Sequence, residues 1–277
     1  MNAIEVKLKS LYLVRHGERL DERKSDLWEE IVRLKHISRQ KKQNVSEVAV
    51  SQPNFVKLLR RYDLQRHTAE LLLYLDKLYP QTCTRKIDEI KNDSILTPFK
   101  GKQKARVRAL SLQRYFTSNN LVLPTEIYSS ALIRAVETAA ALSTEFNNIP
   151  IYVSKSLATS AARVQDGHVN TFHTINELRA LFPTNRIYCC DEGADVDGNS
   201  TPGGIVAPIQ TLAYSATEEF RNSDVDSINK IVTNSGSPNF LVVSHREGIR
   251  NMWDREMKEN KTRPLPYKLQ YCEGKSL

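Results

Sequence analysis

Residues 10–18 read SLYLVRHGE, a short apolar run that ends abruptly in charged residues. The apolar part, 10–14, has the length of a buried strand, and the polar residues follow at its carboxyl end. A second apolar run over 240–244, FLVVS, ends in the same way at His245. Ligands of open α/β sheets bind beyond the carboxyl ends of the strands, so these two endings predict a shared site.

The remainder of the chain alternates short strands with helices. Further strands are expected over 126–129, 151–153 and, at an edge of the sheet, 267–272. Helices are expected over 99–117, 131–146, 174–181, 205–221 and 247–259. This alternation predicts an α/β three-layer sandwich in which helices flank a mainly parallel sheet.

The 277 residues are interpreted as one domain, 1–277, because no change in composition divides them. Residues 25–92 are interpreted as a helical insertion within it. In that insertion a helix is expected over 25–44, a loop over 45–52 and one or two helices over 54–79.

The composition is that of an ordinary globular protein, with 40% hydrophobic and 26% charged residues. It excludes a disordered chain, a collagen-like repeat and a disulfide scaffold. The net charge of +8 is compatible with an anionic partner, and equally with a role in solubility alone.

The four cysteines have no CxxC spacing, so no metal site is expected. No apolar run is long enough for a membrane span or a signal peptide, which favours a cytoplasmic protein without membrane contact.

Four basic residues follow strands and can converge on one crevice: Arg15, His16, Arg134 and His245. Two arginines and two histidines in one crevice make an anion site. Phosphate suits it best, because the fork of a guanidinium matches two phosphate oxygens at a time. A single histidine after a strand is more often structural, so the prediction depends on the set of four.

The motifs that contain these residues resemble those of the histidine phosphatase superfamily, whose fold is called phosphoglycerate mutase-like. Four motifs occur in the order of the family: LVRHGE at 13–18, DSILTP at 93–98, SSALIRAVET at 129–138 and VVSH at 242–245. Within the superfamily, RHGERLD at 15–21, Trp28 and the tail 265–272 look most like the phosphatase domains of suppressor-of-T-cell-receptor-signalling proteins. Those proteins also carry ubiquitin-associated and SH3 domains.

The resemblance implies that His16 attacks phosphorus and becomes a phosphohistidine, which water then hydrolyses. It also implies that Arg15, Arg134 and His245 hold the phosphoryl oxygens. Arg19 and Glu18 are expected to contact the substrate. No metal and no cofactor are required by this route.

The chain departs from the resemblance at the proton donor. The related phosphatases carry a glutamate a few residues beyond the strand that corresponds to 151–153, whereas 154–160 reads SKSLATS and contains no carboxylate. Three carboxylates are candidate substitutes: Asp166, Glu177 and Glu247. Glu177 fits a solvated helix residue better than a proton donor. Glu247, two residues past His245, is the best placed of the three, and it is equally suited to complement a helix dipole. The missing donor predicts a weak or narrow phosphatase.

Three functions are therefore compared. The first is a metal-independent phosphomonoester hydrolase acting on a small molecule or a phosphopeptide. The second is an inactive or nearly inactive protein of the same fold that binds phosphorylated ligands or partners. The third, nucleic-acid binding through the basic segment 100–108, is disfavoured because no aromatic residues are interleaved with the basic ones. A homodimer is compatible with the resemblance.

Overall fold

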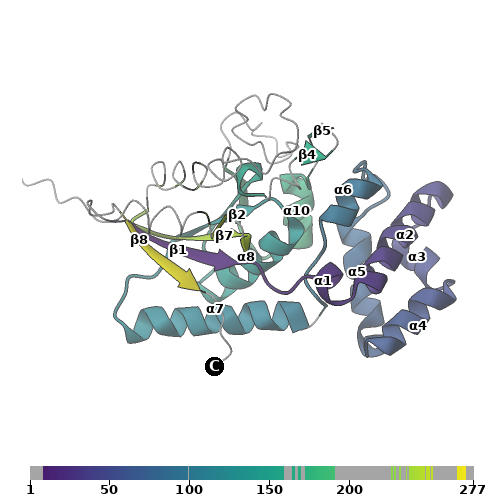
Figure 1. The fold of residues 1–277 in the computed structure, drawn as a ribbon, viewed down its shortest axis with the longest axis horizontal. Helices are drawn as coiled ribbons and strands as arrows, with labels where there is room; N and C mark the ends of the chain where they lie inside the picture. Colours follow the sequence, from purple (N-terminus) through teal and green to yellow (C-terminus); the bar gives the residue numbers. More distant parts are fainter. Residues whose placement is uncertain are drawn as a thin grey trace, which may run out of the picture.

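The computed structural model describes residues 9–98, 100–158, 164–165, 168–169, 172–190, 226, 228, 231, 235, 237–246, 248–249, 251 and 267–272. Its centre is a six-stranded sheet with the strand order β6-β3-β2-β7-β1-β8 (Figure 1). The strands are β1 Lys9–Arg15, β2 Glu126–Ser130, β3 Ile151–Ser154, β6 Ile187–Cys189, β7 Asn239–Ser244 and β8 Tyr267–Cys272. All five pairings in this sheet are parallel. The prediction of an α/β fold with a parallel sheet is confirmed, and 267–272 is the edge strand β8.

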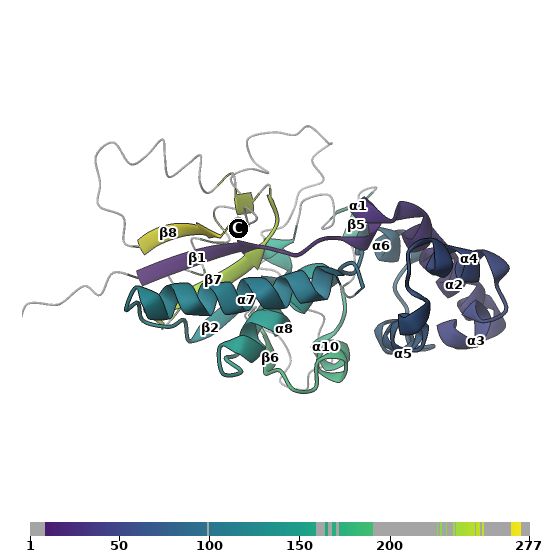
Figure 2. The same cartoon turned by 90° about the horizontal axis from the view of Figure 1, so that it is seen from below.

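Strands β1 and β7 are buried on both faces, which explains why they read as continuous apolar runs. In β1, Tyr12 and Val14 face one hydrophobic cluster, while Leu11 and Leu13 face another. On the first face lie α7 (Lys100–Ser118) and α8 (Ile133–Glu145) (Figure 2). The second cluster contains three isoleucines in helical conformation: Ile228, Ile231 and Ile249. Helical residues on both faces make the predicted three layers.

A helical lobe lies beyond the carboxyl ends of the strands (Figures 1 and 2). Its helices are α1 Leu20–Arg23, α2 Ser25–Lys41, α3 Val45–Ala49, α4 Pro53–Arg61, α5 Thr68–Leu78 and α6 Ile87–Asn92, with a 3₁₀ turn at Gln65–His67. Apolar residues of the lobe belong to the same cluster as one face of the sheet. The lobe spans residues 20–92 and contains the segment 25–92, whose interpretation as an insertion into a single domain stays a prediction.

Several short elements differ from the expectations. The loop expected over 45–52 contains α3, whose residues Val45, Val48 and Ala49 are buried. Helix α6 and strand β6 were not expected either. Elements of three to six residues are too short to display a period, and tertiary packing decides their conformation. A two-stranded antiparallel ribbon, β4 Val164–Gln165 with β5 His168–Val169, was also not expected.

Other predicted elements agree or lie outside the described residues. Helices over 99–117, 131–146 and 174–181 correspond to α7, α8 and α10 (Ile175–Leu181). The helix expected over 205–221 and most of that over 247–259 lie outside the described residues. No helix in the described part of the chain is both long and apolar enough to cross a membrane.

Candidate active site

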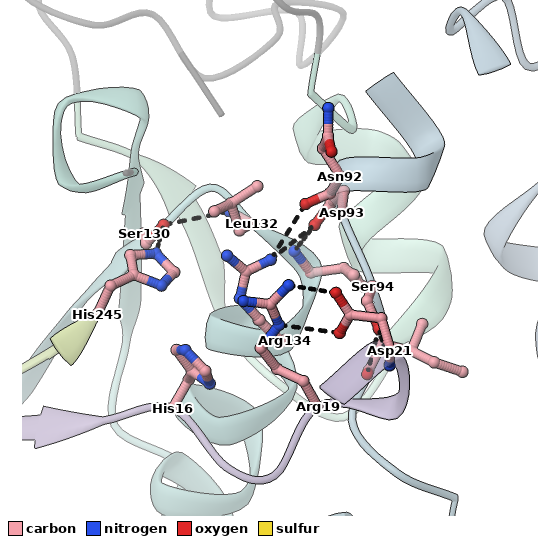
Figure 3. Close-up of polar contacts among 12 residues, drawn as sticks. His16, Arg19, Asp21, Asn92, Asp93, Ser94, Ser130, Leu132, Arg134 and His245 are labelled. Carbon is pink, nitrogen blue, oxygen red and sulfur yellow. Dashed lines mark hydrogen bonds and ion pairs between the residues drawn. The ribbon is translucent and has the colours of Figure 1, made fainter. Parts of the chain in front are cut away.

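The sheet brings three of the basic residues together at the carboxyl ends of its central strands (Figure 3). His16 follows β1, Arg134 lies in the first turn of α8 after β2, and His245 follows β7. The ring centroids of His16 and His245 are 5.0 Å apart. The backbone N–H of His16 donates to the carbonyl oxygen of Ser244 at 3.1 Å, which extends the β1–β7 pairing into the site. All three side chains are buried.

The His16 ring is held in one tautomer. Its Nδ1 lies 2.8 Å from the carbonyl oxygen of Gly17. A carbonyl oxygen only accepts hydrogen bonds, so Nδ1 carries the proton and Nε2 keeps its lone pair. Burial, followed by the positive charge of Arg134, lowers the pKa of His16 well below its usual value. His16 is therefore a neutral imidazole at pH 7, with Nε2 available as a nucleophile.

The turn that carries His16 is anchored to α8. The backbone N–H of Gly17 donates to Thr138 Oγ1 at 3.0 Å, and the Thr138 hydroxyl donates to the carbonyl oxygen of Arg134 at 2.8 Å. A Cβ atom at Gly17 would lie 3.1 Å from Leu96 Cδ2, which leaves little space for a larger residue in this turn. The turn after His16 and Arg134 are thus linked through two hydrogen bonds.

His245 is also neutral and has one free ring nitrogen. Its Nε2 lies 2.8 Å from Ser130 Oγ, whereas its buried Nδ1 has no hydrogen-bond partner among the described residues. Ser130 Oγ accepts from the backbone N–H of Leu132 at 3.3 Å, so its hydroxyl proton can go to Nε2 of His245. Nδ1 would then be the protonated nitrogen and a donor to a ligand. Burial, then the charge of Arg134, lowers the pKa of His245 well below its usual value.

Arg134 is buried and only partly paired. Its Nη1 donates to the carbonyl oxygen of Asn92 at 3.4 Å and lies 4.0 Å from Asp93 Oδ1. Burial, followed by the charge of Arg19, lowers its pKa to about 10, so it remains a cation at pH 7. The buried Nε atoms of Arg134 and Arg15 have no hydrogen-bond partner among the described residues. A phosphate group would supply the acceptors that these donors lack.

Asp93 positions Arg134, a role that the sequence did not reveal. One oxygen of Asp93 accepts from the backbone N–H of Ile133 at 2.8 Å, and the other accepts from Arg85 Nη1 at 3.0 Å. The carboxylate therefore fixes the start of α8 and faces the Arg134 guanidinium. Its partners lie 8 and 40 positions away in sequence. In the sequence, the only indication that Asp93 is important was its place in the motif 93–98, which resembles a motif of the histidine phosphatase superfamily.

Arg19 and Glu18 are both held by neighbouring charged groups. Arg19 Nε donates to Asp21 Oδ1 at 2.9 Å, and Nη1 lies 3.3 Å from Glu22 Oε1. Glu18 Oε2 accepts from Lys104 Nζ at 2.7 Å. Burial acts to raise the pKa of Glu18, but the Lys104 contact outweighs it and the pKa is lowered. Glu18 thus joins the turn after His16 to α7. Contact of Arg19 or Glu18 with substrate stays a prediction.

Of the three candidate proton donors, only Glu177 lies among the described residues, and it is engaged at the start of α10. Glu177 Oε2 accepts from the backbone N–H of Thr174 at 2.8 Å, and the Thr174 hydroxyl accepts from the backbone N–H of Glu177 at 3.1 Å. This capping box begins α10. Burial acts to raise the pKa of Glu177, but contacts with His173 and Thr174 lower it to about 2. Glu177 is therefore ionised at neutral pH and ill suited to protonate a leaving group. Asp166 and Glu247 lie outside the described residues.

Among the described residues, no group of three or more His, Cys, Asp or Glu side chains is arranged to hold a metal ion.

Stability should fall on acidification because three buried histidines resist protonation. Burial is the first cause of the lowered pKa of His16, His173 and His245. Below pH 6.5 the unfolded chain binds protons that the folded chain does not, so the free energy of unfolding decreases as pH falls. We expect a loss of about 1.4 kcal/mol per pH unit for each histidine that stays neutral.

Urea unfolding at pH 7.5 and pH 5.5 measures this loss. Glu177 does not contribute to the change in the free energy of unfolding between these two pH values, because its pKa is lowered to about 2 and it is ionised at both. His245→Gln should reduce the pH dependence, whereas replacement of the exposed His36 by Gln should not. Equal stability of the wild-type protein at both pH values would contradict the buried neutral histidines.

Comparison with known proteins finds no match to a family model. No curated protein matches the sequence. Among solved structures, the ecdysone phosphate phosphatase from Bombix mori, in complex with tungstate, is similar at 15% identity and a TM-score of 0.47; the match covers 96% of this chain and 83% of that one. A mycobacterial glucosyl-3-phosphoglycerate phosphatase is similar at 18% identity and a TM-score of 0.32, covering 60% of this chain and 69% of that one. Both matches are distant, so the chemistry of this chain is inferred from the residues of its own site.

Proposed function

We propose that this protein is a phosphomonoester hydrolase that acts through a phosphohistidine on His16. The observation that carries the proposal is the hydrogen bond from His16 Nδ1 to the carbonyl oxygen of Gly17 at 2.8 Å. It leaves the lone pair of Nε2 on a neutral ring beside Arg134 and His245. A strong nucleophile next to unpaired cationic donors is the combination that phosphoryl transfer requires.

In the proposed reaction, Nε2 of His16 attacks phosphorus in line with the leaving oxygen. The N–P bond forms as the P–O ester bond breaks, and the leaving group departs with the electron pair of that bond. Arg134, Arg15 and the Nδ1–H of His245 offset the negative charge on the phosphoryl oxygens. Water then attacks the phosphohistidine, which releases inorganic phosphate and returns His16 to the neutral state. The residues assigned to this route need neither a metal nor a cofactor.

The proposal places the chain in the histidine phosphatase superfamily, near the suppressor-of-T-cell-receptor-signalling type. Its support is the order of the four motifs, with the phosphate-binding positions converging at the strand ends. Trp28, part of the resemblance to that type, is buried and donates from Nε1 to the carbonyl oxygen of Lys91 at 2.9 Å. The substrate is a phosphorylated small molecule or a phosphopeptide. A cytoplasmic location and a homodimer belong to the same proposal.

The enzyme should prefer activated leaving groups. A general acid contributes about 10²–10⁴-fold to a rate, and Glu177 cannot supply it while it caps α10. Aryl phosphates release a weakly basic phenolate that needs no proton, whereas alkyl phosphates release a strongly basic alkoxide. We therefore expect turnover of p-nitrophenyl phosphate to exceed that of a simple alkyl phosphate by at least about 10²-fold.

The test is an assay of the purified protein with p-nitrophenyl phosphate in the presence of EDTA. Turnover should survive the chelator, and mass spectrometry of rapidly quenched protein should locate phosphate on His16. Turnover without any phosphohistidine, or turnover abolished by EDTA and restored by a metal ion, would contradict the mechanism.

The second candidate is a protein that binds phosphorylated ligands without turnover. It is favoured by the capping role of Glu177, which removes one of the three candidate proton donors. It predicts that inorganic phosphate binds the folded protein while p-nitrophenyl phosphate is not hydrolysed.

Nucleic-acid binding is less well supported, because three of the basic residues of α7 have structural partners. Lys102 lies over the Tyr74 ring at 3.9 Å, Lys104 contacts Glu18, and Arg106 pairs with Glu145 at 2.9 Å. These contacts join α7 to three different segments. They favour the interpretation that its charges serve packing and solubility.

A further inference from the structure

A cavity of about 350 Å³ adjoins the turn that carries the nucleophile. Its walls come from that turn and from α1, α7 and α8. The lining residues are Arg15, His16, Gly17, Glu18, Glu22, Arg23, Lys104, Ala105, Arg108 and Thr138. Arg134 and His245 are not among them, so the cavity adjoins the phosphoryl site but is not the same space.

Cations outnumber carboxylates in this cavity. The cations are Arg15, Arg23, Lys104 and Arg108, and the carboxylates are Glu18 and Glu22. With His16 neutral, the side chains that line the cavity carry a net positive charge. A concave surface with an excess of one charge attracts ligand groups of the opposite charge.

The two carboxylates are already paired with cations. Glu18 Oε2 lies 2.7 Å from Lys104 Nζ and 3.5 Å from Arg23 Nε. Glu22 Oε1 lies 3.3 Å from Arg19 Nη1, outside the cavity lining. Neither acid is therefore left to neutralise the remaining arginines.

Arg108 is the cation that keeps donors for a second group, and Arg15 lies where the cavity meets the phosphoryl site. Within the described residues, neither has a carboxylate within 4.0 Å. The buried Nε of Arg15 has no hydrogen-bond partner there either. Arg108 Nη1 donates to the carbonyl oxygen of Arg15 at 3.3 Å, which fixes the guanidinium against the nucleophile turn while its other N–H groups remain.

We propose that this cavity is a second anion subsite, which holds a carboxylate or second phosphate of the substrate while His16 attacks the first phosphoryl group. The inference rests on the proposed function. His16 lines the cavity and carries the Nε2 that attacks phosphorus, so the cavity and the phosphoryl site meet at this residue and one substrate can occupy both. A volume of about 350 Å³ is at the small end of ligand pockets, which suits a compact acidic group. The substrate class is thus a phosphomonoester with a second anionic group.

The experiment compares phenyl phosphate with 3-carboxyphenyl and 4-carboxyphenyl phosphate at constant ionic strength. We expect the wild-type protein to have a kcat/KM about tenfold higher for at least one carboxylated substrate than for phenyl phosphate, because one added charge-assisted contact provides about this much binding energy. The gain should come mainly from a lower KM. Arg108→Gln should remove this preference, and Arg108→Lys should keep part of it because a cation remains. Arg106→Gln is the matched control on the same helix, outside the cavity, and should leave the preference intact.

The outcomes separate this inference from the proposed function. No turnover of phenyl phosphate by the folded wild-type protein would contradict the hydrolase itself. Turnover with no preference for either carboxylated substrate, or a preference that persists in Arg108→Gln, would overturn the subsite alone. The wild-type comparison stands even if the Arg108 variants do not fold. A change in phenyl phosphate turnover caused by benzoate, without preference for the carboxylated substrates, would identify a free effector and also overturn the subsite.

Discussion

The His16→Ala variant is expected to lose turnover of p-nitrophenyl phosphate by about 10⁴-fold or more, as removal of a covalent nucleophile commonly does. The physical reason is that Nε2 of this ring carries the only lone pair assigned to attack phosphorus. Arg15, Arg134 and His245 would still bind phosphate in the variant. We therefore expect kcat to fall far more than KM rises, and no phosphorylated protein to be trapped.

The matched control for this variant is His36→Ala. His36 is exposed on α2, where its Nε2 lies 2.9 Å from Gln40 Nε2, so its loss should leave turnover unchanged. Circular dichroism and urea unfolding of both variants show whether the fold is retained. Substantial turnover by a folded His16→Ala protein would exclude His16 as the nucleophile, and the proposed mechanism with it.

The Arg134→Lys variant should lower kcat by about 10²–10³-fold, the range found when one group that stabilises transition-state charge is removed. Lysine keeps the positive charge but cannot present two parallel donors to the phosphoryl oxygens. Arg134 is also the second cause of the lowered pKa of both His16 and His245. A shorter, displaced cation should let these pKa values rise, so the acid limb of the pH–rate profile should move to higher pH.

The pH profile distinguishes a role in the site from a merely structural one. A variant that is only less stable loses activity without a shift of its acid limb. Arg186→Lys replaces an exposed arginine away from the described site. It is the control for the effect of an Arg-to-Lys replacement as such, and should leave the pH–rate profile unchanged. Unchanged kcat in Arg134→Lys would mean that the guanidinium does not act on the transferred phosphoryl group.

The sequence predicted the central strands well and the short elements poorly. The apolar runs that became β1 and β7 are buried on both faces, and the alternation of such runs with helical segments indicated a parallel sheet. Helices α7 and α8 have 19 and 13 residues, enough to display a helical pattern. Helix α3 and strand β6 have 5 and 3 residues, too few to display a periodic pattern, so packing against other elements decides their conformation.

The amino-acid sequence by itself determined which side chains stand at the carboxyl ends of the strands, because strand, turn and helix follow one another locally around His16, Arg134 and His245. Only the tertiary structure decided what those side chains can do. Gly17 contacts Thr138 across 121 positions, and His245 contacts Ser130 across 115. The neutral state of His16 depends on burial by such distant neighbours. The hydrogen bonds between Glu177 and Thr174 depend on the conformation at the start of α10. Protonation and hydrogen bonding are properties of a three-dimensional environment, which residue order specifies only through the completed fold.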